Sequence, residues 1–115
     1  MKRRIFYYLE IALQLAARKQ DRRFLHAAVG IRSDGTLVQA CNGPAKTPNR
    51  MGHAEYRLCR KLDYGAEVYV VRLSRETGQL VLSRPCNNCI KVLKSKKVKR
   101  VYYSIGPNEF GVINL

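Results

Sequence analysis

Three side chains in the sequence have the types and spacing of a zinc site with one open coordination position. They are His53, Cys86 and Cys89, within the segments H-A-E and P-C-N-N-C. Cysteines three residues apart project from one face of the first turn of a helix, and an imidazole can enter from the start of a second helix. One imidazole and two thiolates leave a fourth position for water, and Glu55 can handle that water's proton. The pattern therefore indicates hydrolytic chemistry.

A closed structural site, with four protein ligands, is the main alternative, and its fourth ligand would have to be Cys41, Cys59 or His26. Cys59 lies about 240° around a helix from His53, so it is expected in the core. Cys41 and His26 lie in apolar, strand-like runs and are interpreted as structural residues. A redox pair remains an alternative for the C-x-x-C segment on its own, but not for the combination with H-x-E.

The rest of the sequence predicts the elements that must position these side chains. Apolar residues at helical spacing predict an amphipathic helix over residues 3–19. Runs 24–32 and 36–41 predict a hairpin, because Ser33-Asp34-Gly35 between them is a turn sequence. A loop over residues 42–51 then leads to a predicted helix that starts near His53, runs to about Asp63 and is ended by Gly65.

The second half of the chain predicts further strands around one more helix. The expected elements, in order, are a buried strand at Val68–Val71, a turn at Thr77-Gly78, a helix from Cys86 to about Lys96 and a strand from Val98 to Ile105. Only ten residues follow this strand, too few for a helical crossover, so a last strand should fold back antiparallel. We therefore expect a single domain, residues 1–115, with a three-layer α/β/α sandwich around a central mixed five-stranded sheet.

Composition narrows the class of protein further. The chain has 115 residues, of which 46% are hydrophobic, so it can bury one core. Two of its four cysteines are assigned to metal, which argues against a disulfide framework and for a reducing, cytoplasmic location. No secretory or membrane-spanning segment is expected, since the apolar stretches are short.

The motifs and their order resemble the cytidine deaminase-like superfamily over nearly the whole chain. H-x-E followed by P-C-x-x-C is the signature of zinc nucleobase deaminases. The segment Ala40-Cys41-Asn42-Gly43-Pro44 resembles the strand-end loop of deoxycytidylate and tRNA-editing deaminases, and residues 99–104 resemble the strand after the cysteine helix. Two features depart from the family pattern: the detour from Ser74 to Leu82, and Arg84 in place of serine, threonine or glutamate.

The resemblance implies one Zn²⁺ per chain on His53, Cys86 and Cys89, with Glu55 as the catalytic proton shuttle. It also implies that Asn42 binds a sugar hydroxyl, although a turn former before Gly43 is the alternative for that residue. The backbone N–H of Ala54 and the carbonyl of Arg84 would contact the base. Hydrolytic removal of the 4-amino group of cytosine would give uracil.

The charge of the chain indicates the class of substrate. Lysine and arginine number 22 against 8 acidic residues, a net charge of +14, which favours a polyanionic partner over a merely solvated surface. Single-stranded DNA or RNA is therefore expected, bound by Lys94, Lys96, Lys97, Lys99 and Arg100. Three alternatives stay open: a free (deoxy)cytidine or (deoxy)cytidylate deaminase, a tRNA adenosine deaminase, and a non-catalytic zinc module that binds nucleic acid. The sequence leaves the oligomeric state undetermined.

Overall fold

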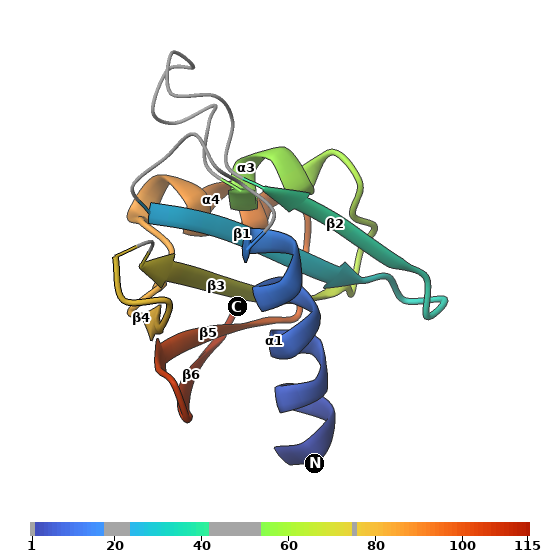
Figure 1. Ribbon diagram of the computed structural model, residues 1–115. Helices are drawn as coiled ribbons and strands as arrows, with labels where there is room; N and C mark the ends of the chain where they lie inside the picture. The colour runs from blue at the N-terminus through green and yellow to red at the C-terminus, as the bar shows by residue number, and fades with distance from the viewer. Residues whose placement is uncertain (1, 18–23, 42–53, 75) are drawn as a thin grey trace.

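The computed structural model describes residues 2–17, 24–41, 54–74 and 76–115. In this part of the chain a six-stranded sheet carries α1 on one face and α3 and α4 on the other (Figure 1). The predicted α/β/α sandwich is thus confirmed. Among the described residues, no helix is long and apolar enough to cross a membrane.

Helix α1, Lys2–Ala17, places its apolar face on the sheet. Leu9, Ala12 and Ala16 recur at three- and four-residue spacing and are buried against β1 and β3. The predicted helix over residues 3–19 is confirmed as far as Ala17, and residues 18 and 19 lie outside the described part of the chain.

Strands β1, Phe24–Ile31, and β2, Leu37–Cys41, form the predicted antiparallel hairpin. Gly35 has a φ of 90°, a left-handed conformation that only glycine adopts without strain. The Asp34 carboxylate accepts a hydrogen bond of 2.9 Å from the backbone N–H of Thr36 and closes the same turn. The turn sequence therefore sets the hairpin as expected.

Helix α3, Ala54–Cys59, is shorter than the sequence predicts. The prediction that it continues to Asp63 is wrong. The N–H of Lys61 donates to the carbonyl of Leu58 at 2.8 Å, a three-residue bond that tightens the chain. Asp63 then accepts hydrogen bonds from the backbone N–H and the hydroxyl of Ser33, at 3.0 and 2.6 Å. This anchor to the β1–β2 turn draws the chain away from the helix axis.

Strand β3, Glu67–Ser74, extends the predicted buried run at both ends and lies at the centre of the sheet. The turn at Thr77-Gly78 is confirmed, since Gly78 has a φ of 70° and its N–H donates to the carbonyl of Ser74 at 2.8 Å. The chain returns as β4, Leu80–Val81, antiparallel to β3. This short strand is the sixth of the sheet, one more than predicted.

Helix α4, Asn87–Ser95, connects β3 and β4 to β5, Arg100–Gly106, and the chain closes with β6, Glu109–Asn114. Strand β5 is parallel to β3, and β6 is antiparallel to β5 as expected from the short tail. The path through the sheet is β2-β1-β3-β5-β6. Strands β2, β3 and β5 therefore all end at one edge, which we call the carboxyl edge.

Alternation along the strands divides the core into two layers. Val68 and Val70 pack towards α3 and α4, whereas Tyr69 and Val71 pack towards α1. Tyr69 stacks on Tyr102 with 4.7 Å between ring centroids, and burial raises the pKa of the Tyr69 phenol well above its ordinary value. These aromatic rings belong to the α1-side core.

Candidate zinc and catalytic site

The two cysteines of P-C-N-N-C stand at the start of α4. Cys86 is the residue that caps the helix, with an extended backbone at φ −69° and ψ 165°, and its sulfur accepts a hydrogen bond of 3.5 Å from the N–H of Cys89. The Cys86 side chain is exposed, whereas Cys89 is 1% exposed and packs in the first turn. The predicted arrangement of both sulfurs at the first turn of one helix is present.

The amino ends of α3 and α4 point to the same edge of the sheet. The chain that follows the carboxyl end of α3 is held at the opposite edge by the contact between Asp63 and Ser33. The chain that follows the carboxyl end of α4 is held there too, because the carbonyl of Lys97 accepts a hydrogen bond from the N–H of Gly65. The two helices pack side by side on one face of the sheet (Figure 1). Ala54 at the start of α3 and Cys86 at the start of α4 therefore both lie towards the carboxyl edge.

Several predicted site residues fall outside what the structure describes. His53 and Asn42 lie in the segment 42–53, and of Glu55 only the backbone, within α3, is described. Cys41, which precedes Asn42, is the last residue of β2 and therefore lies at the carboxyl edge. Among the described residues no group of three or more histidine, cysteine or acidic side chains could hold a metal, and only two of the three predicted ligands are described.

The donor set nevertheless suits zinc. Cys86 caps a nine-residue helix and Cys89 lies in its first turn, so both residues are at the amino end, where the helix dipole stabilises negative charge. The first turn of α4 carries no acidic side chain that would oppose this charge. Soft thiolates with an imidazole are a ligand set that zinc prefers.

The other cysteines and histidine occupy different environments. Cys59 is 3% exposed and packs in the core between the sheet and α3–α4, which confirms its prediction as a core residue. Cys41 and His26 are half-buried on strands β2 and β1. Their structural interpretation stays a prediction.

The basic residues that surround the cysteines, including the five predicted to bind nucleic acid, divide into groups along α4. Arg84, Lys91 and Lys94 are exposed, before and along the helix. Lys96, Lys97 and Lys99 follow at its carboxyl end, away from the cysteines. Arg100 begins β5, where its guanidinium pairs at 3.3 Å with Glu67, which also pairs with Arg4 of α1 at 3.1 Å. Arg100 is thus engaged on the α1 side of the molecule.

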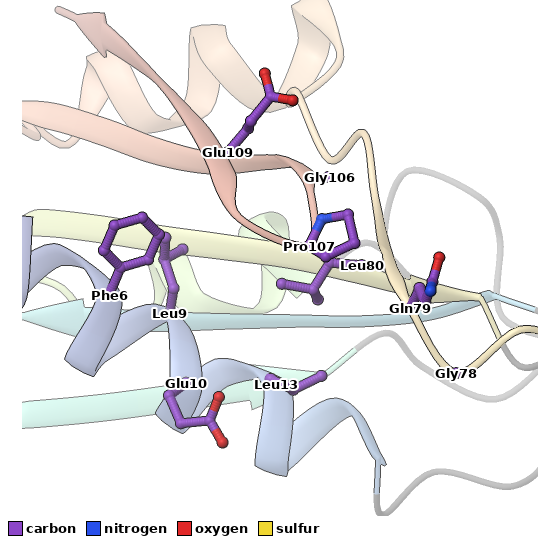
Figure 2. A pocket seen from close by; sticks show the side chains of 10 residues that line it. All are labelled: Phe6, Leu9, Glu10, Leu13, Gly78, Gln79, Leu80, Gly106, Pro107 and Glu109. Carbon is purple, nitrogen blue, oxygen red and sulfur yellow. The ribbon is translucent and has the colours of Figure 1, made fainter.

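A pocket with a cavity volume of about 190 Å³ lies elsewhere, on the α1 side of the sheet. Figure 2 shows its lining residues, which come from α1, from the β3–β4 turn with the start of β4, and from the β5–β6 turn with the adjoining strand ends. Phe6, Leu9 and Leu13 supply the α1 wall, opposite Leu80 and Pro107. None of its lining residues is a predicted site residue, so this pocket and the cysteine site are separate features.

Comparison with protein families identifies the class to which this arrangement belongs. Residues 2–105 match the model described as the cytidine and deoxycytidylate deaminase zinc-binding region. The match spans most of the chain, which therefore belongs to this family of deaminases. Zn²⁺ is accordingly its metal cofactor, and hydrolytic deamination is the reaction class of the family.

Solved structures share the fold at low sequence identity. Cytidine deaminase from Burkholderia pseudomallei has a TM-score of 0.66 at 17% identity, over 95% of this chain and 91% of that one. Deoxycytidylate deaminase from the cyanophage S-TIM5, in apo form, has a TM-score of 0.65 at 18% identity, over 91% and 85%. Cytidine deaminase from Mycobacterium leprae has a TM-score of 0.63 at 18% identity, over 92% and 90%. No curated protein gives a significant match to the sequence.

Two buried residues near the site belong to no sequence motif. Ser83 and Ser104 are 3% and 0% exposed, and their hydroxyl oxygens lie 2.8 Å apart. Serine is common in loops and strands, so nothing in the sequence distinguishes this pair. A buried polar pair becomes visible only when the strands are assembled.

Proposed function

We propose that the chain is a zinc-dependent deaminase that converts cytosine to uracil in single-stranded DNA or RNA. The observation that carries this proposal is the pair of cysteines at the start of α4. Cys86 caps the helix and Cys89 lies buried in its first turn, at the edge of the sheet towards which α3 also begins. Membership of the deaminase family supports the reaction class.

The metal ligands in this proposal are His53, Cys86 and Cys89. Bound zinc supplies Lewis-acid chemistry, because it lowers the pKa of a water molecule towards neutrality. Both cysteines lie at the amino end of α4, where the helix dipole complements the negative charge of thiolate ligands. Two thiolates also neutralise the charge of the metal, and no further acidic ligand is needed.

Glu55 moves the protons of the reaction. Its carboxylate takes a proton from the attacking water and delivers it to the ring nitrogen next to the carbon under attack. A second proton transfer assists departure of the amino group as ammonia. One water is consumed, the C–N bond to the amino group breaks, a C–O bond forms, and uracil remains.

Backbone groups near the ligands suit recognition of the base. The described part of α3 begins at Ala54, and the N–H of this residue would donate to a base carbonyl. The carbonyl of Arg84 precedes the buried Pro85 and would accept from the amino group. Asn42, which follows the end of β2, would bind a sugar hydroxyl.

Charge on the surface supports the polymeric substrate. Arg84, Lys91 and Lys94 are exposed, and they extend from the residue before Pro85 along the cysteine helix. The acid-free run from Lys91 to Lys99 adds three more lysines beyond the helix. A series of cations that starts at the reacting base can follow a phosphate backbone, and only a single strand or a flipped nucleotide can place a base in such a site.

A free nucleoside or nucleotide is the second candidate substrate. The similar structures from Burkholderia pseudomallei and the cyanophage are named as deaminases of cytidine and deoxycytidylate. Arg84 is exposed two residues before Cys86, so its guanidinium is available for a single phosphate. This observation favours a nucleotide over a neutral nucleoside.

A side-by-side assay tests the proposal. Uracil formation is measured with cytidine, deoxycytidine, their monophosphates and a cytosine-containing oligonucleotide, all at low salt. The proposal expects the oligonucleotide to be the best substrate. If a monophosphate is deaminated far faster and the oligonucleotide is not deaminated, the substrate is a free nucleotide, which is the second candidate. Absence of uracil from every substrate would refute cytosine deamination.

A further inference from the structure

The sheet forks directly upstream of the cysteine helix. Strand β3 pairs with β5 up to the Val70–Tyr103 partners, and then pairs with β4 at Arg72–Val81. Where a strand changes partners, backbone N–H and carbonyl groups lose their place in the ladder. Such groups are costly when buried without a hydrogen bond.

Ser83 and Ser104 occupy this fork and supply the missing partners. The Ser83 hydroxyl donates to the carbonyl of Val70 at 3.0 Å and accepts from the N–H of Ser104 at 2.7 Å. The Ser104 hydroxyl donates to the carbonyl of Val81 at 2.7 Å. The backbone N–H of Ser83 also donates to the carbonyl of Ser104, at 2.9 Å. Both side chains are buried, so these bonds are shielded from competition by water.

The network fixes the chain three residues before Cys86. Between Ser83 and Cys86 the backbone has little freedom, because the proline ring fixes the φ of Pro85 and disfavours the helical conformation for Arg84. Pro85 is itself fully buried. An anchored Ser83 therefore determines where Cys86 lies and where α4 begins.

We propose that Ser83 and Ser104 are positioning residues for the metal site, which hold the Cys86–Cys89 pair in the geometry that zinc requires. The proposal rests on the proposed function in assigning those two cysteines as zinc ligands. It adds that the zinc affinity of the chain depends on two hydroxyls that are not ligands. Groups that orient metal ligands typically change metal affinity by about 10–100-fold when removed.

The test uses Ser83→Ala and Ser104→Ala, with Val29→Ala as a matched control. Val29 is fully buried in the α1-side core, so its truncation lowers stability without touching the fork. The zinc dissociation constant is measured by competition with a chromophoric chelator, at a temperature where each variant is folded. The absorption spectrum of the Co²⁺-loaded protein reports the ligand geometry independently of activity.

We expect Ser83→Ala to weaken zinc binding by about tenfold and to alter the Co²⁺ spectrum, with Val29→Ala within about twofold of the wild type. Ser104→Ala retains the Ser83 hydroxyl and gives the same direction of change if Ser83→Ala fails to fold. Wild-type affinity and spectrum in the serine variants would overturn the proposal, as would an equal loss in Val29→Ala. Cys86→Ser separates the two claims: if it retains zinc, the ligand assignment itself is wrong, whereas if it loses zinc while both serine variants keep it, only the positioning role fails.

Discussion

The single residue Cys86 has two roles, because it is a proposed zinc ligand and it also caps α4. The sequence predicted the ligand role, because one histidine and two cysteines at this spacing form a typical ligand set for zinc. The capping role needed the structure, in which the sulfur accepts from the N–H of Cys89. His53, the side chain of Glu55 and Asn42 stay predictions, since the structure does not describe them.

Substitution of the proposed proton shuttle separates chemistry from metal binding. Glu55→Gln retains the shape of the side chain but cannot accept a proton, so turnover should fall by about 100-fold or more. Zinc content, measured by metal analysis on the same preparation, should stay at the wild-type level. Near-normal turnover in the variant would remove Glu55 from the mechanism.

Asp63 gives the fold a dependence on pH. Hydrogen bonds from the Ser33 side chain and backbone lower the pKa of this carboxyl below its ordinary value of 3.8. A carboxyl with a lowered pKa in the folded state contributes stability above pH 3.8, and this contribution is lost as the pH falls through the lowered value. Urea unfolding at pH 7 and pH 3 should therefore show a smaller pH difference in Asp63→Asn than in the wild type. An equal difference in both proteins would show that the carboxylate does not contribute.

Packing between elements is tight where β1 passes beneath α3 and the segment that follows it. A Cβ added at Gly30 would lie 2.5 Å from a methyl group of Leu62 and 3.2 Å from one of Val38. Gly30→Ala should therefore destabilise the protein, by about 1–3 kcal/mol as for other overpacked core positions. Gly106→Ala is the matched control, because an added Cβ there meets nothing within 4 Å. Equal midpoints of thermal unfolding for the two variants would contradict this packing.

Most elements could be predicted from the sequence, and the exceptions have a shared cause. Periodicity and turn residues predicted α1 and the β1–β2 hairpin, because these depend on local patterns. The antiparallel β6 was predicted from the ten residues after the preceding strand, which are too few for a helical crossover. The early end of α3 depends instead on the bonds from Ser33 to Asp63, which join residues distant in sequence. The Ser83–Ser104 network was also missed, since it exists only where β3, β4 and β5 meet. The assignment of residues 1–115 to one domain stays a prediction.

At the scale of the whole molecule, the net charge of +14 bears on the substrate. If exposed lysines on α4 contact phosphates, the affinity for a single-stranded oligonucleotide should fall steeply with salt. Lys94→Glu should then reduce the slope of log affinity against log salt by about 0.7, which is the expected value for one phosphate contact. Activity on free cytidine should change little, because a neutral nucleoside gains little from remote charge.

Arg3→Glu is the control for this measurement, since it makes the same change in net charge. Arg3 is exposed on α1, on the face of the sheet opposite α4. Equal slopes for Lys94→Glu and Arg3→Glu would mean that overall charge, rather than a binding surface on α4, governs the interaction. No effect of salt on either protein would refute the polymeric substrate.

Metal analysis of purified variants tests most directly whether His53, Cys86 and Cys89 together hold one zinc ion. Zinc per chain is measured for the wild type, Cys86→Ser and Cys89→Ser, with Cys41→Ser as a cysteine control outside the proposed ligand set. We predict about one zinc per chain for the wild type and for Cys41→Ser, and a large loss in the other two, because a thiolate ligand is missing. Undiminished zinc in Cys86→Ser or Cys89→Ser would contradict the account.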